Sequence, residues 1–127
     1  IRVSLFVEAN RAQLDAAVSL GAPVVELHTG AYEHAVIDGD VDLRDRLLAQ
    51  IREAAIYGTS RGLEVHAGHG LTFDNVKPIA ALPEVMELNI GHFLIGEAIF
   101  SGLDPAIRQM RKLMDEARMP TQHGARV

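Results

Sequence analysis

Two patterns of hydrophobic and polar residues alternate along the chain. Short apolar runs predict strands, and each is followed by a segment whose apolar residues recur at the three- and four-residue spacing of one helix face. Such alternation is typical of βα units that build a parallel sheet. The predicted strands are Val3–Val7, Val24–His28, Leu63–Ala67 and Met86–Ile90.

The predicted helices follow the strands, and local signals mark some of their ends. Asn10 is a suitable N-cap for the first helix, which ends near Gly21. The segment Thr29–Asp42, after the second strand, is predicted to be a long loop. The remaining predicted helices are Leu43–Arg61, Asp74–Ala81 with an interruption near Pro78, His92–Phe100 and Asp104–Arg118.

Polar residues on the predicted strands distinguish two architectures. In an open flavodoxin-like sheet helices cover both faces, so strands should be nearly continuous apolar runs. Here the last three strands carry polar residues at alternate positions, which fits better the interior and mouth of a TIM (β/α)8 barrel. These polar residues are Glu26 and His28, Glu64 and His66, and Glu87 and Asn89.

The length of the chain bears on how much of a barrel it can form. A complete barrel has about 250 residues and eight strands, whereas this chain has 127 residues. We therefore predict an α/β chain that supplies half of a barrel over residues 1–118, with the first and fourth strands as unpaired edges. The segment Met119–Val127 contains Pro120 and Gly124 and has no periodicity, so we expect a flexible tail there.

Composition excludes several classes of protein. The net charge is −5, the pI is about 5.6 and only two residues are lysine, which argues against a nucleic-acid partner. The absence of cysteine excludes a disulfide scaffold, a thiolate nucleophile and a cysteine-based zinc site. No apolar run approaches the roughly twenty residues that span a bilayer, and the first residues lack the regions of a signal peptide. We therefore expect a cytoplasmic protein without a membrane partner.

Two Gly-His turns are the strongest chemical signal in the sequence. The segment Glu64–Gly70 reads EVHAGHG and Glu87–His92 reads ELNIGH, so two predicted strands each end in such a turn. Glycine lets the backbone approach an anion, and histidine moves protons near neutral pH. Consecutive strand ends of this kind match the place where α/β barrels bind phosphorylated substrates. We predict phosphate contacts from the backbone N–H groups of Gly70 and Gly91, from the helix that follows Gly91, and from His92.

Glu26 and His69 are the candidate acid–base residues. Glu26 is flanked by apolar residues, and burial without a charge partner would raise its pKa toward the range useful for proton transfer. The alternative is a buried ion pair with Arg2 or Arg52. His69 lies between two glycines and should project into the barrel mouth, although a histidine in a turn can also simply cap a helix.

The other histidines raise the possibility of a metal site. Together with His69, Glu26 and Glu64, the residues His28 and His66 would provide enough nitrogen and oxygen ligands for zinc or iron. Their spacing matches no metal-binding motif. We therefore predict no metal site, and the residues alone leave the roles of His28 and His66 open.

Several of these motifs together resemble the C-terminal half of pyridoxine 5′-phosphate synthase. The resemblance extends to about Arg118 and lies in Val3–Val7, Val25–Gly30, His66–Thr72, Asn75–Val76 and Glu87–His92. It implies the last four βα units of a barrel enzyme of vitamin B6 biosynthesis. That enzyme condenses 3-amino-2-oxopropyl phosphate with 1-deoxy-D-xylulose 5-phosphate, forming pyridoxine 5′-phosphate, phosphate and water. The resemblance also implies no metal, no organic cofactor and a cytoplasmic homo-octamer.

The resemblance assigns a role to each candidate residue. It implies that Glu26 stabilises the transition state, that His69 donates a proton, that Gly70 binds substrate, and that Gly91 and His92 hold phosphate. The family's N-terminal half, with its further bases, is not in these 127 residues, so we expect the chain alone to be inactive. Two alternatives stay open: another phosphosugar-handling barrel enzyme, and a non-catalytic, self-associating half-barrel that binds phosphate.

Overall fold

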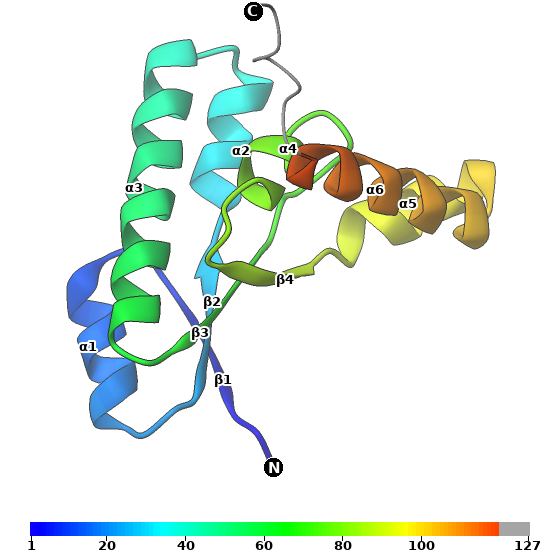
Figure 1. Ribbon diagram of the computed structural model, residues 1–127. Coiled ribbons are helices and arrows are strands. Elements are labelled where there is room, and N and C mark those ends of the chain that lie inside the picture. The colour runs from blue at the N-terminus through cyan, green and yellow to red at the C-terminus, as the bar shows by residue number, and fades with distance from the viewer. Residues whose placement is uncertain (120–127) are drawn as a thin grey trace, which may run out of the picture.

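A parallel sheet organises residues 1–119, which are the residues that the computed structural model describes (Figure 1). The strands are β1 (Ser4–Val7), β2 (Val24–His28), β3 (Glu64–Gly68) and β4 (Val85–Asn89). They pair in the order β1-β2-β3-β4, all parallel. The predicted α/β alternation is confirmed, and the first and fourth strands are the edges of this sheet, as predicted.

Helices follow each strand, and two of them have the caps that their sequences indicate. The helices are α1 (Arg11–Ser19), α2 (Gly30–Ile37), α3 (Val41–Ser60), α4 (Val76–Ala80), α5 (His92–Ser101) and α6 (Leu103–Arg118). Asn10 caps α1 as predicted, because its side chain accepts a hydrogen bond from Gln13 N at 3.0 Å. Asp40 caps α3 in the same way through Leu43 N at 2.9 Å, so this helix begins two residues before the predicted start.

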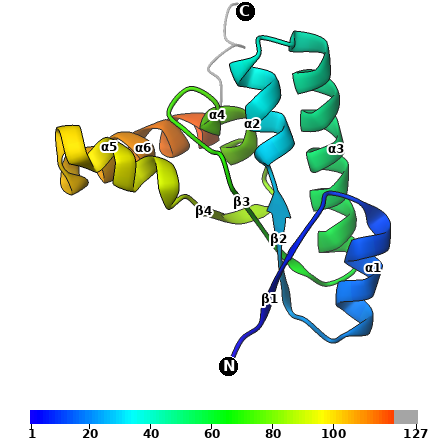
Figure 2. The ribbon, with the colours of Figure 1, turned by 180° about the vertical axis from the view of Figure 1, so that it is seen from behind.

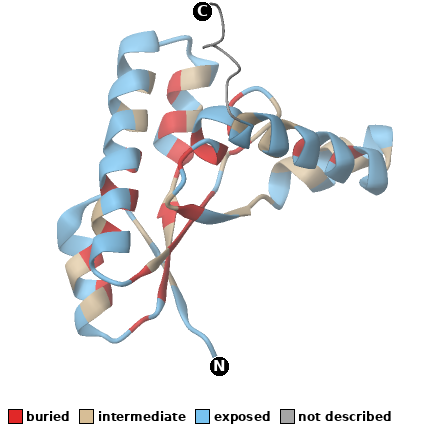
Figure 3. Cartoon of the chain, viewed as in Figure 1, coloured by how far each residue is buried: buried red, intermediate tan, exposed pale blue. Residues whose placement is uncertain are grey.

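One face of the sheet packs against α1 and α3. Val25, Leu27 and Val65 are fully buried there and belong to one apolar cluster with Leu14 of α1 and Ile51 of α3. Figures 1 and 2 show α1 and α3 together on this side, and Figure 3 shows that burial is concentrated along the strands and the helix surfaces that face them. Because full burial of a Val or Leu side chain contributes about 1.5–3 kcal/mol, this cluster is the main source of stability.

The opposite face of the sheet carries the polar residues. In the strand register Glu26 lies beside His66, and His66 beside Glu87, while Gly68 lies beside Asn89. Residues in register share a face of a sheet, so the alternate polar positions predicted from the sequence form rows across three strands. The polar side chains of these strands therefore lie on the face away from α1 and α3.

The predicted loop Thr29–Asp42 is wrong, because it contains the helix α2. Its first residue is a glycine, and Thr29 makes no side-chain cap, so the usual signals of a helix start are missing. The helix is instead held by tertiary contacts: Tyr32 is buried and its hydroxyl donates to Asn75 O at 3.0 Å. The buried residues Gly30, Tyr32 and Ala35 do not all lie on one face of the helix, so the sequence has no single apolar stripe that periodicity could detect.

Two smaller predictions are also corrected. Pro78 does not interrupt α4, since it lies in the first turn, where backbone N–H groups have no partner within the helix. The fourth strand begins at Val85 and contains an irregularity, because Val65 pairs with Val85 but His66 pairs with Glu87. Met86 is the extra residue and is exposed.

The last two helices form a pair that extends away from the sheet (Figures 1 and 2). Helix α6 packs against α4 and α5, and its last residue, Arg118, donates to the carbonyls of Ala80, Leu82 and Val85. These bonds tie the end of α6 to the start of β4. Of the predicted tail only Met119 is described, and residues 120–127 lie outside the described part. No helix within residues 1–119 is long and apolar enough to cross a membrane.

Candidate active site

A cavity of about 780 Å³ lies at the carboxyl ends of the strands. This volume is within the range of about 300–1,000 Å³ that is usual for small-molecule sites. The lining residues are Phe6, Glu26, Glu33, His69, Gly70, Leu71, Thr72, Asn89, Ile90, Gly91, His92 and Phe93. The structure thus brings together all five residues that the sequence singled out: Glu26, His69, Gly70, Gly91 and His92.

The carboxylate of Glu26 on β2 is held by a residue of β4, on the far side of β3. Asn89 Nδ2 donates to Glu26 Oε2 at 2.9 Å, while Arg2 pairs with Glu64 instead. The close approach depends on Gly68, because a Cβ there would lie 2.2 Å from Glu26 Oε1 and 2.8 Å from Asn89 O. In the described chain Glu26 is therefore positioned by an amide, and neither arginine considered from the sequence pairs with it.

His69 has an unusual backbone conformation. Its φ is 77°, and within residues 1–119 it is the one residue other than glycine with a positive φ. This backbone conformation costs energy and is frequent at functional sites. Thr29, which is fully buried, holds this turn: its hydroxyl lies 2.8 Å from Gly68 O and 2.6 Å from His69 O. The backbone N–H of Thr29 also donates to Gly68 O at 2.9 Å. The imidazole is thus presented from a fixed turn.

The turn continues through Gly70, whose surroundings require glycine. Its φ is 81°, and a Cβ there would lie 2.8 Å from the Cβ of Glu33. Asn75 fixes the following loop, since it accepts from Thr72 N at 2.7 Å and donates to Gly70 O at 3.0 Å. The backbone around Gly70 is therefore held on both sides and faces the cavity.

Gly91 and His92 begin helix α5 at the cavity wall. The N–H groups of the first turn of a helix have no partners within the helix and carry partial positive charge. Here the N-cap residue makes no side-chain hydrogen bond to them either. A Cβ at Gly91 would meet nothing within 4 Å, so close packing does not require this glycine. The helix end can receive an anion.

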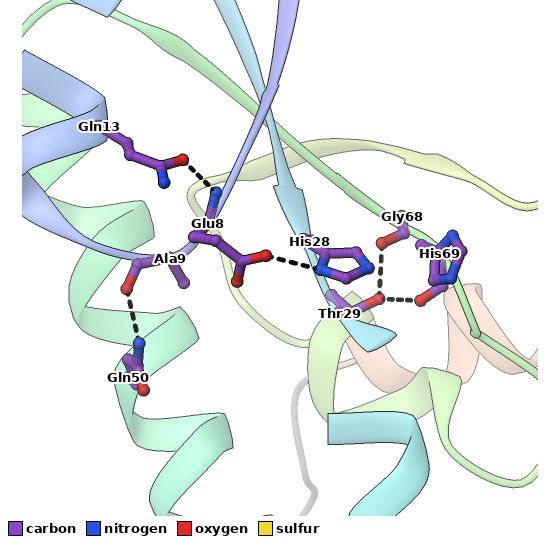
Figure 4. Close-up of polar contacts among 8 residues, drawn as sticks. All are labelled: Glu8, Ala9, Gln13, His28, Thr29, Gln50, Gly68 and His69. Atoms are coloured by element: carbon purple, nitrogen blue, oxygen red, sulfur yellow. Dashed lines mark hydrogen bonds and ion pairs between the residues drawn. The ribbon is translucent and has the colours of Figure 1, made fainter. Parts of the chain in front are cut away.

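His28 and His66 occupy two different environments. His28 Nδ1 lies 2.9 Å from Glu8 Oε1 (Figure 4), and its ring centroid is 4.7 Å from that of His69. His66 is buried and its Nε2 lies 2.7 Å from Glu64 Oε1. Hydrogen bonds from Arg2 first, and then from His66, lower the pKa of Glu64 below its ordinary value of 4.5.

No group of three or more metal-ligating side chains occurs within residues 1–119. The five residues considered for a metal are divided among separate contacts. His28 pairs with Glu8, His66 with Glu64, and Glu26 with Asn89. The arrangement provides acid–base groups and anion-binding N–H groups.

Some lining residues have no local signal in the sequence. Asn89 is one of the alternating polar residues, but its hydrogen bond to Glu26 joins residues 63 positions apart, which no local pattern reveals. Glu33 lies on α2, and because that helix was predicted as a loop, its side chain could not be placed. The position of Phe6 on the same face as Glu26 could have been found from the strand register.

Comparison with known proteins shows a match along nearly all of the chain. The family model described as pyridoxal phosphate biosynthesis protein PdxJ matches residues 1–116. The pyridoxine 5′-phosphate synthase of Ruegeria pomeroyi is 65% identical over 117 residues, which are 92% of this chain and 47% of that protein. The corresponding proteins of Roseobacter denitrificans and Jannaschia sp. are 62% and 61% identical, over 92% and 93% of this chain and 47% and 48% of their own lengths. The chain spans about half the length of these curated relatives.

Proposed function

The chain belongs to the family of the pyridoxal phosphate biosynthesis protein PdxJ, and from this we propose that it forms part of the active site of a pyridoxine 5′-phosphate synthase. The substrates would be 3-amino-2-oxopropyl phosphate and 1-deoxy-D-xylulose 5-phosphate. The observation that carries the proposal is the single cavity in which Glu26, His69, Gly70, Gly91 and His92 meet. It combines a carboxylate, an imidazole and a helix N-terminus, as a reaction between two phosphorylated molecules requires.

Phosphate binding is proposed for the start of α5. The first-turn N–H groups after Gly91 would donate to the phosphate oxygens, and the side chain of His92 would add a further donor. Gly70 would bind substrate through the backbone that Asn75 holds in place.

Proton transfer is proposed for His69, and charge stabilisation for Glu26. Closure of the pyridine ring needs imine formation, several proton transfers and the loss of phosphate and water, so acid and base groups must act in turn on one trapped intermediate. His69 would donate a proton to a departing oxygen. Glu26, with one oxygen bonded to Asn89, would stabilise positive charge that develops on the intermediate.

The wider architecture is also a proposal. Two features favour an eight-stranded barrel to which this chain would contribute four βα units. They are the polar face of the sheet and the open edges of β1 and β4. We place the assembled protein in the cytoplasm as a homo-octamer that uses no metal and no organic cofactor. Sedimentation equilibrium of the assembled enzyme would give its mass, and a monomer would contradict the octamer.

A chimera tests the function directly. Residues 1–117 of this chain would replace the matching segment of the Ruegeria pomeroyi synthase, and pyridoxine 5′-phosphate formation would be followed from the two substrates. We expect activity, a kcat lower by about 10²- to 10⁴-fold in His69→Asn, and a loss of about 10²- to 10³-fold in Glu26→Gln. His92→Ala should mainly raise a substrate KM, by roughly tenfold, because it removes one hydrogen bond to a charged group.

The matched control is Glu53→Gln, which changes an exposed carboxylate of α3 and should leave kcat and KM unchanged. A folded chimera without product would refute the proposed function. Full activity in His69→Asn would instead refute the role of this residue while leaving the family assignment intact.

A further inference from the structure

We propose that Glu8 and His28 form a positioning pair that fixes the imidazole of His69. The consequence for turnover rests on the proposed function, whereas the effect on the His69 ring is independent of it. Neither residue lines the cavity, so both would act through His69. Figure 4 shows the three residues together with the backbone contacts that surround them.

Glu8 is held in place from two helices. It follows β1, and its backbone N–H donates to Gln13 Oε1 of α1 at 2.7 Å. The next residue, Ala9, accepts a hydrogen bond from Gln50 Nε2 of α3 at 2.9 Å (Figure 4). These contacts fix the backbone from which the Glu8 carboxylate reaches His28 across the end of the sheet.

The carboxylate determines how His28 is protonated. An ionised carboxylate only accepts hydrogen bonds, so the contact of 2.9 Å between Glu8 Oε1 and His28 Nδ1 requires a proton on Nδ1. In the neutral ring Nε2 is then unprotonated. Glu8 thus fixes both the tautomer and the orientation of the His28 ring.

The His28 ring in turn packs against His69. Their centroids are 4.7 Å apart at an interplanar angle of 60°, and Phe6 lies edge-on to His28 at 5.0 Å. Gly30 makes this packing possible, because a Cβ there would lie 2.8 Å from His28 Nε2 and 3.0 Å from His69 Cδ2. The two imidazoles therefore occupy the space that a side chain at position 30 would fill.

Three consecutive residues thus act on His69. His28 packs against its ring, Thr29 binds its backbone carbonyl, and Gly30 leaves room for its Cδ2. A catalytic side chain held by packing and by supporting hydrogen bonds keeps its productive geometry, and a displacement of about 1 Å can cost 10²-fold in rate. Of these contacts, the Glu8–His28 hydrogen bond can be removed by substitution of one exposed residue, Glu8.

The test uses long-range ¹H–¹⁵N spectra of the histidine rings in the 127-residue chain. Wild type should show His28 with its proton on Nδ1. Glu8→Ala should shift His28 toward the Nε2–H tautomer and change the ring signals of His69, and Glu8→Gln, which keeps an acceptor oxygen, should partly restore both. Since Glu8 is 57% exposed, the substitution should not unfold the chain. Glu53→Ala, an exposed carboxylate change on α3, is the control.

Gly30→Ala is a second variant that changes no charge and should move the ring signals of both His28 and His69. In the chimera, Glu8→Ala should lower kcat by about 10- to 100-fold with KM changed less than about twofold. Because the added Cβ of Gly30→Ala would touch His69 directly, this variant shows only that the ring signals report on the packing; unchanged His69 ring signals in Glu8→Ala would overturn the proposal. A chimera with no activity at all would refute the proposed function, and the ring spectra would still decide the positioning role.

Discussion

Substitution of Gly68 by alanine tests how the cavity is built. Gly68 is the last residue of β3, and its backbone does not have positive φ, so alanine fits the local conformation. The added Cβ would lie 2.2 Å from Glu26 Oε1, 2.8 Å from Asn89 O and 3.1 Å from Asn89 Cβ. The carboxylate can rotate away, but the backbone of Asn89 belongs to the neighbouring strand and cannot move without disturbing the sheet.

The cost follows from these two contacts. Insertion of a methyl group into a packed site typically costs about 1–3 kcal/mol, and loss of the Glu26–Asn89 hydrogen bond adds about 1 kcal/mol. We therefore expect Gly68→Ala to lower the free energy of unfolding by about 2–4 kcal/mol. The same displacement would move the Glu26 carboxylate, so the chimera carrying Gly68→Ala should lose activity along with stability.

Urea unfolding followed by circular dichroism measures the first effect, and product formation by the chimera measures the second. Gly96→Ala is the matched control, because a Cβ there meets nothing within 4 Å and alanine is favoured over glycine inside a helix by about 1 kcal/mol. A Gly68→Ala protein with the unfolding midpoint of wild type and unchanged activity would refute this description of the β3–β4 junction.

Three further predictions concern stability. Arg118→Ala should lower the free energy of unfolding by roughly 2 kcal/mol or more in urea titrations, because it removes charge-assisted bonds to three carbonyls; Arg108→Ala, whose partner is exposed, should change it little. Thr29→Val should cost about 1–3 kcal/mol in the same assay, since the carbonyl of His69 loses its buried donor. In the folded chain the pKa of Glu64 is lowered from 4.5. The stabilisation that ionised Glu64 contributes is therefore complete above pH 4.5 and is lost as the pH falls through the lowered folded-state pKa. Glu64→Gln should reduce the fall in the free energy of unfolding over this acidic range, and an unchanged pH dependence would contradict the prediction.

Much of the fold follows from local patterns in the sequence. The strands were predicted within one residue because each is a short apolar run followed by a helical period. The position of the cavity was also predictable, since Gly70 and Gly91 follow consecutive strands of a parallel sheet, whose carboxyl ends share one edge. Alternation of polar residues indicated which face of the sheet carries Glu26.

The remaining features depend on contacts between distant residues. The sequence of helix α2 carries no apolar stripe on one face, and the helix is stabilised instead by burial of Tyr32 and its bond to Asn75. The partner of Glu26 is Asn89, and that of His28 is Glu8; in both pairs the residues come together only when strands align. The irregularity at Met86 likewise arises from pairing with β3 and has no signal in the sequence.

The rate of pyridoxine 5′-phosphate formation by the unmutated chimera with the Ruegeria pomeroyi synthase is the most direct test of the central claim. If residues 1–117 provide the acid–base and phosphate-binding half of the active site, the chimera should turn over within about tenfold of the parent enzyme, since roughly 1.4 kcal/mol of misfit at the junction would account for that factor. A chimera that folds and assembles like the parent but forms no product would contradict the claim that this cavity performs the reaction.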